Sequence, residues 1–209
     1  MFTQSITISA IIFLISASIT GCGGGKTTTS NKFDGKEYVP VDAGDLSRSE
    51  SSISGSGSFV FNTPLTESDS KDSYRITFTL QEGGSLNLVA HSTNTLTNGA
   101  GLKFTRSGSA LVVSIETPGG STNVSDKFKT GSGVDASKEL TFQIDNHGEE
   151  LAHIVAWDSS IASPDKTNAR FNSEDDGQAK GRGAGTYWGI LLSKAGITSA
   201  QLSSAKFIE

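Results

Sequence analysis

The chain contains a single cysteine, so it can form neither an internal disulfide nor a metal site built from several thiolates. Only two tryptophans and three histidines occur among its 209 residues. Acidic residues outnumber basic ones by 22 to 17, and the net charge of -5 argues against binding to nucleic acid through a basic surface. The fold must therefore be stabilised by its hydrophobic core.

One apolar run, Ile6 to Ile19, is too short to span a membrane and is typical of a secretory signal. It ends in Ile19-Thr20-Gly21-Cys22, which resembles the lipobox of bacterial lipoproteins. The resemblance implies cleavage before Cys22 and attachment of a diacylglycerol and a further acyl chain such as palmitate. Two or three acyl chains would hold the protein stably on a membrane. The alternative is an ordinary signal peptide that leaves Cys22 as a free thiol.

The residue after the cysteine is Gly23 rather than Asp, and by resemblance to the sorting rule of enteric bacteria this favours the outer membrane of the cell envelope. Residues 23–32 contain no apolar side chain, which is typical of a flexible tether. The expected organisation is a signal peptide at 1–21, a lipidated N-terminus and flexible linker at 22–52, and a β-sandwich domain at 53–209.

Downstream, short apolar segments alternate with turn residues. In Tyr74–Leu80 every second residue is apolar, which predicts that Tyr74, Ile76, Phe78 and Leu80 share one buried face. Phe142 and Ile144 alternate in the same way and are expected in the same core. Only Ser193–Leu202 is compatible with a short helical turn. The pattern predicts an all-β fold, a two-sheet antiparallel β-sandwich.

Three of these segments, 140–147, 152–157 and 185–192, resemble consecutive strands of the concanavalin A-like or laminin G-like jelly roll. Members of that superfamily include lectins, glycanases, adhesion modules and structural spacers. The resemblance implies a jelly-roll sandwich and raises the expectation that the protein binds a glycan or a glycoprotein, although fold alone does not decide function.

Catalytic motifs are not found. Glycanases of this superfamily carry Glu-x-Asp-x-x-Glu along a strand, whereas the acidic residues Glu174, Asp175 and Asp176 are contiguous here. No Gly-x-Ser-x-Gly nucleophile motif occurs either. No catalytic residue is predicted, and a glycan-cleaving enzyme remains the less favoured alternative.

Aromatic side chains that stack on sugar rings and polar side chains that bind their hydroxyls suggest a binding site. A long loop, Ser159 to Gly185, and the strand ends beside it hold such residues. The candidate ligand-binding residues are Trp157, Asp158, Asn172, Asp175, Asp176, Arg182, Tyr187 and Trp188.

The alternatives are a calcium site and a different class of function. Asp165, Asp175 and Asp176 are candidate calcium ligands, and no other cofactor is expected. An exposed Trp157 or Trp188 in an open groove would favour glycan binding. Burial of both indoles would favour a structural or envelope-assembly lipoprotein that contacts another protein.

Overall fold

The protein is described here from a computed structural model. The structure describes residues 31–62, 73–97, 99–117, 120–123, 134–146, 151–160, 171–176 and 185–203. Every regular element in these ranges is a β-strand, and all strand pairs are antiparallel. Within the same ranges, no helix is long and apolar enough to cross a membrane.

The strands are β1 (Asn31–Phe33), β2 (Lys36–Asp42), β3 (Ser47–Arg48), β4 (Ile53–Phe61), β5 (Ser73–Ser92), β6 (Ala100–Ser107), β7 (Ala110–Thr117), β8 (Gly120–Asn123), β9 (Leu140–Asn146), β10 (Leu151–Asp158), β11 (Phe171–Asp176) and β12 (Tyr187–Ser203).

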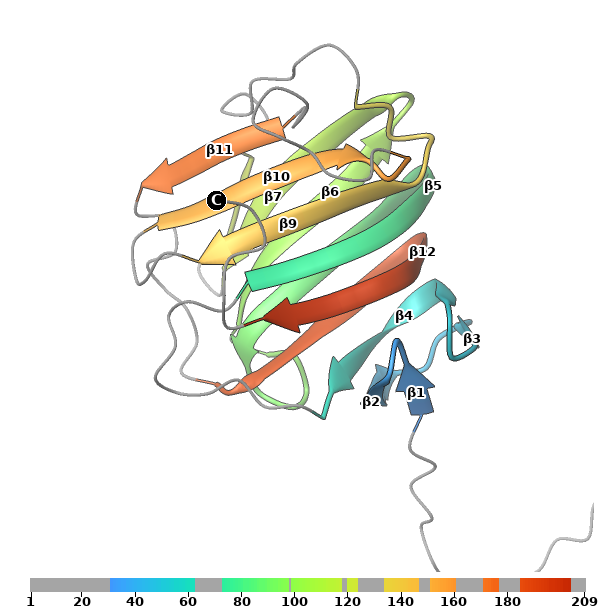
Figure 1. Cartoon of the computed structure of the whole chain (residues 1–209). Helices are drawn as coiled ribbons and strands as arrows, with labels where there is room; N and C mark the ends of the chain where they lie inside the picture. Colours follow the sequence, from blue (N-terminus) through green and yellow to red (C-terminus); the bar gives the residue numbers. More distant parts are fainter. Residues whose placement is uncertain are drawn as a thin grey trace, which may run out of the picture.

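Two sheets pack face to face, and the long strands β4, β5 and β12 run through both. Sheet I has the order β1-β2-β4-β12-β5-β6-β7-β8. Sheet II is formed where β9 pairs with the first half of β5, β10 pairs with β9, and β11 pairs with β10. The second half of β12 and the start of β4 complete it, with β3 at the edge. Figure 1 shows β9, β10 and β11 in one layer, with β6 and β7 behind them. The predicted antiparallel β-sandwich is confirmed.

The strands change sheets at a tight corner. Gly83 adopts a left-handed backbone conformation (φ 67°), and Lys194 on the neighbouring strand does the same (φ 48°). A Cβ at Gly84 would lie 2.4 Å from the carbonyl oxygen of Lys194, so only glycine lets β5 and β12 approach this closely. The Gly83-Gly84 pair thus marks a bend within one strand.

Aromatic rings join the two sheets in the core. Tyr74, Ile76, Phe78 and Leu80 are all buried, as the alternation predicts. Phe104 of sheet I stacks on Phe142 of sheet II with ring centroids 4.5 Å apart, and Phe78 contacts both rings. Burying such rings supplies the hydrophobic stabilisation that a chain with one cysteine requires.

The prediction that 22–52 forms a flexible linker is wrong for the described part of that range. Residues 31–48 contribute β1, β2 and β3, and both Phe33 and Tyr38 are buried in the core. The turn after β1 is fixed by Asp34, whose carboxylate accepts hydrogen bonds from Ser199 Oγ (2.9 Å) and Ala200 N (3.0 Å) on β12. The sandwich therefore includes residues from Asn31 onward. Residues 1–30 lie outside the described ranges.

Two further expectations are corrected. The segment Ser193–Leu202 is not helical but forms the second half of β12, because pairing with both β4 and β5 overrides its weak local pattern. The stretch Ser159–Gly185 is not one continuous loop, since β11 lies within it and pairs with β10 from Ala156↔Phe171 to Leu151↔Asp176. The side chain of Ile144 lies outside the described part.

Candidate functional site

The structure does not place the two tryptophans on one exposed surface. Trp188 of β12 is fully buried (0% exposed) in the core, where it stacks on Phe61 at 4.0 Å and contacts Tyr74 at 5.6 Å. Its indole Nε1 is buried and has no hydrogen-bond partner within the described ranges. A ring enclosed in this way cannot stack on a sugar.

Trp157 of β10 is also buried, with 4% of its surface exposed. It lies beside Thr141 of β9, and the Arg75 guanidinium sits 5.7 Å from the centre of its ring. Arg75 in turn donates two hydrogen bonds to Gln143 Oε1, at 3.1 and 2.7 Å. This cation–π contact covers one face of the indole. Burial of both indoles is the outcome expected from the sequence for a structural or envelope-assembly protein rather than for a tryptophan platform.

The remaining predicted site residues are dispersed. Asp158 is half-buried and forms an ion pair with Lys138 at 3.4 Å. A hydrogen bond from the backbone N–H of Ser160 lowers the pKa of the Asp158 carboxyl. Tyr187 is half-buried at the start of β12, opposite Ser92 of β5.

For Asn172, Asp175 and Asp176 the structure gives backbone positions on β11, opposite Val155, Ala152 and Leu151. Their side chains are not among the described ones, and Cys22, Asp165 and Arg182 lie outside the described residues altogether. In the described part of the chain, no group of three or more His, Cys, Asp or Glu side chains is arranged to hold a metal ion. The calcium site thus stays a prediction.

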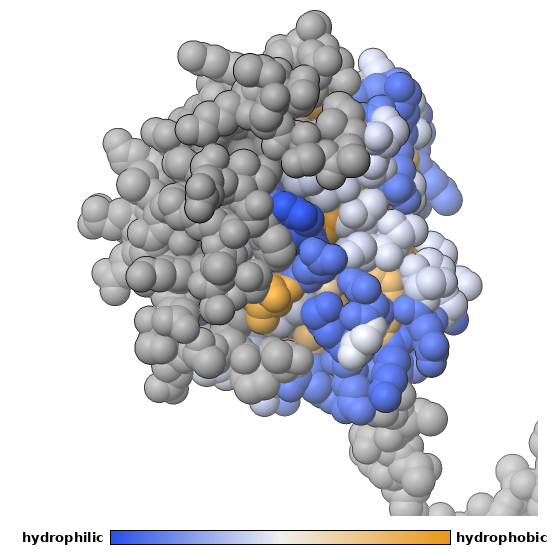
Figure 2. All heavy atoms as spheres, in the orientation of Figure 1, coloured by the Kyte–Doolittle hydropathy of each residue, from blue (hydrophilic) through white to orange (hydrophobic). Residues whose placement is uncertain are grey.

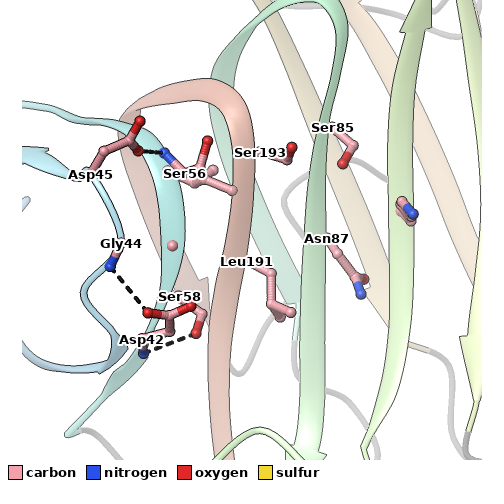
Figure 3. Close-up of a pocket in the computed structure, with 12 residues that line it drawn as sticks. Asp42, Gly44, Asp45, Ser56, Ser58, Ser85, Asn87, Leu191 and Ser193 are labelled. Carbon is pink, nitrogen blue, oxygen red and sulfur yellow. Dashed lines mark hydrogen bonds between the residues drawn. The ribbon is translucent and has the colours of Figure 1, made fainter.

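A different feature has the geometry of a binding site. A groove of about 440 Å³ lies on the outer face of sheet I, away from the core. We call it the outer-face groove after this position, and most of the residues that line it are polar (Figure 3). It is lined by Asp42, Gly44, Asp45, Ser56, Gly57, Ser58, Ser85, Asn87, Lys103, Leu191, Leu192 and Ser193.

The floor of the groove is a continuous row of residues that face one another across five strands. Asp42 of β2 lies opposite Ser58 of β4, and Ser58 lies opposite Leu191 of β12. Leu191 faces Asn87 of β5, and Asn87 faces Lys103 of β6. Neighbouring strands lie about 4.8 Å apart, so the four steps of this row span about 19 Å.

The wall at the β2 end is held by backbone contacts of the turn between β2 and β3. The backbone N–H of Gly44 donates to Asp42 Oδ1 at 3.1 Å, and that of Ser56 donates to Asp45 Oδ1. The N–H of Asp42 donates to Ser58 Oγ at 3.2 Å. Figure 3 shows these three hydrogen bonds gathered on one side of the groove. One oxygen of each carboxylate there therefore accepts a hydrogen bond from the protein itself.

The opposite half carries groups with hydrogen-bonding capacity to spare. Asn87 Oδ1 is buried beside Gly101 and has no hydrogen-bond partner among the described residues. A half-turn of the amide exchanges its two ends, so Asn87 can offer the groove a donor or an acceptor. No hydrogen bond or ion pair joins Lys103 to another described residue. Leu191 is 36% exposed and adds an apolar patch between the polar groups.

This groove could not be predicted from the sequence because its residues are distant in the chain and meet only through strand register. A local signal existed nonetheless. Asn87 lies between buried Leu86 and Leu88, and Lys103 lies between buried Leu102 and Phe104. A polar residue between two inward-facing ones marks the outer face of a strand.

Comparisons with known proteins give the fold. No protein-family profile and no curated protein matches the sequence. The carbohydrate-binding module CBM66 from Bacillus subtilis aligns with a TM-score of 0.54 at 10% identity, covering 83% of this chain and 98% of the module. The exoplasmic/lumenal domain of VIP36, in a form bound to Ca²⁺ and mannose, aligns with a TM-score of 0.53 at 11% identity, covering 82% and 84%. The chain thus has the β-sandwich fold of these carbohydrate-binding proteins.

Proposed function

We propose that the protein is a non-catalytic glycan-binding protein and that the outer-face groove is its binding site. The observation that carries this proposal is the row from Asp42 to Lys103, in which four polar side chains and the exposed Leu191 lie side by side across five strands. Sugar rings present hydroxyls at their edges and C–H groups on their faces, so a groove with both kinds of contact suits them.

The fold comparison supports the same reading. CBM66 is by its title a carbohydrate-binding module, and VIP36 was crystallised with mannose. Fold similarity at this level of identity does not carry function by itself, so the main support for glycan binding is the groove. No paired carboxylates are placed across it, because Asp42 and Asp45 lie on the same side and accept hydrogen bonds from backbone N–H groups.

The buried indoles favour a second candidate, a structural or envelope-assembly protein that contacts another protein. Trp188 and Trp157 cannot provide the aromatic platform on which the glycan hypothesis was first based. The groove leads us to prefer glycan binding nevertheless, because none of its contacts requires an exposed tryptophan.

We further propose that the domain is displayed on a bacterial membrane, through lipid on Cys22, with the outer membrane as its location. The lipobox sequence and Gly23 support this part of the proposal. A tether of residues 23–30 would hold the sandwich close to the bilayer, because an extended chain spans at most about 3.6 Å per residue.

A glycan array probed with the full chain in mild detergent tests the function. The wild-type chain should bind a defined set of glycans, and Asn87→Ala should weaken that binding about fivefold, the value of one net hydrogen bond. Removing an amide whose buried oxygen has no partner among the described residues should leave the melting temperature nearly unchanged.

Gln201→Ala, an exposed change on β12 away from the groove, is the control. Binding that Asn87→Ala leaves intact would contradict the proposed site, and no binding at all would favour the structural alternative.

A further inference from the structure

We infer that the outer-face groove selects glycans that carry an acidic group, a carboxylate or a sulfate, and that Lys103 receives this group over β6. The inference rests on the proposed glycan-binding function and adds the charge and the direction of the ligand.

The first observation is the state of Lys103. Three other cations of the described chain form ion pairs: Lys36 with Asp34 at 3.9 Å, Arg106 with Glu82 at 3.4 Å, and Lys138 with Asp158. Lys32 and Lys194 have no ion pair among the described residues, but both are exposed to solvent. Lys103 is partly buried in the groove and has no such partner among the described residues. A partly desolvated ammonium without a counter-charge attracts an anion more strongly than a fully solvated one.

The second observation is the distance between the charges of the groove. Asp42 stands at the other end of the row, about 19 Å from Lys103 by strand spacing. That separation exceeds the Debye length of about 8 Å at physiological ionic strength, so Asp42 does not neutralise Lys103. The nearest acid on β7 is Glu116, opposite Gly101. Its carboxylate accepts a hydrogen bond at 2.7 Å from Ser114 Oγ, and Ser114 is the residue opposite Lys103, but no ion pair joins Glu116 and Lys103 in the described part of the chain.

The groove is therefore electrically polar along its length, negative at β2 and positive at β6. A ligand that carries acidic groups on every sugar would meet Asp42 and Asp45 at the negative end. A glycan with an isolated acidic sugar avoids that repulsion and binds in one direction, with the acidic sugar at Lys103. Asn87, directly opposite Lys103, can donate a hydrogen bond to the same carboxylate or sulfate or accept one from a neighbouring hydroxyl.

The test uses the full chain in mild detergent on an array of matched glycan pairs. In one arm, glycans containing a uronic acid are compared with their methyl esters. In the other arm, singly sulfated glycans are compared with their desulfated forms. In at least one arm, the wild-type protein should bind the acidic glycan about tenfold or more tightly than its neutral partner. The arm in which this happens shows whether the groove recognises a carboxylate or a sulfate. The preference should weaken as salt is raised.

Variants of Lys103 decide whether this side chain is responsible. Lys103→Gln should lower the affinity for the acidic glycan to that for its neutral partner, and Lys103→Arg should keep the preference. Lys32→Gln changes an exposed lysine of β1 outside the groove and should have no effect. Equal binding of both members by wild-type protein, or a preference that survives Lys103→Gln, would overturn the inference. If neutral glycans bind and Asn87→Ala weakens that binding, the proposed glycan-binding function holds but the selection of acidic glycans does not. If no glycan binds, both the proposed function and this inference are refuted.

Discussion

Tyr38 places a phenol hydroxyl in the core, where it is buried without a hydrogen-bond partner. Its ring packs against Phe59 with centroids 5.1 Å apart, so the aromatic part of the side chain is well accommodated. Burial raises the pKa of the phenol, and the Arg48 guanidinium offsets part of that rise. The hydroxyl thus opposes stability twice, as an unsatisfied polar group at neutral pH and as an ionisable group at high pH.

We predict that Tyr38→Phe raises the free energy of unfolding by about 1 kcal/mol at neutral pH, because it removes the unsatisfied hydroxyl and keeps the ring. A raised pKa in the folded state means that the wild-type protein is most stable below the unfolded pKa of about 10 and loses stability as pH rises through the folded value. The variant should lose less in that window. Urea unfolding at neutral and alkaline pH measures both effects, with Tyr187→Phe as the control. A lower midpoint for Tyr38→Phe would show that the hydroxyl is satisfied.

At the scale of elements, the bend of β5 turns one strand into a member of both sheets. Two adjacent glycines there have different roles. Gly83 has a positive φ of 67° and open space around it, whereas Gly84 has Lys194 O 2.4 Å and Gln81 O 2.9 Å from the place a Cβ would take. The first glycine supplies a backbone conformation, and the second permits close contact between backbones.

Gly84→Ala should lower the free energy of unfolding by about 1–3 kcal/mol, because the backbone of β12 must move to admit the methyl group. Gly83→Asn should cost less than about 1 kcal/mol, since asparagine tolerates the left-handed region and meets no neighbour. Urea unfolding of the two variants measures the losses, and the midpoints can be compared directly if the m-values are equal. Equal losses at both positions would contradict the separate roles assigned to them.

How much of this could be predicted from the sequence also depends on the element. The alternation in Tyr74–Leu80 gave a correct buried face, because one side of that strand meets only the core. The sequence of the second half of β12 is compatible with a helical turn, and that of β1–β3 with a linker, because the strand structure of both comes from partners distant in the chain. The groove was missed for the same reason. Alternation reports the outward position of Asn87 or Lys103, but only register shows that they are neighbours.

The whole molecule combines this sandwich with a proposed anchor at Cys22. Cys22→Ser should abolish lipid attachment, so the chain should stay unprocessed or leave the detergent phase in a phase-partition experiment. Mass spectrometry of the mature protein provides the second measurement. The single variant Gln201→Ala, an unrelated exposed change, controls for expression. Unchanged partitioning and unchanged mature mass in Cys22→Ser would refute the lipoprotein assignment.

The Asp34 contact with β12 determines how the domain responds to mechanical load. A force applied to the N-terminal side of the domain acts first on β1. This strand pairs with β2 through only three residue pairs, and these pairs alone would separate readily. Asp34 passes part of that pull to Ser199 and Ala200, on a strand that lies between β4 and β5. A force applied before Asn31 would therefore be shared between β2 and the central strand β12, and the β1–β2 hairpin should resist unzipping from its edge.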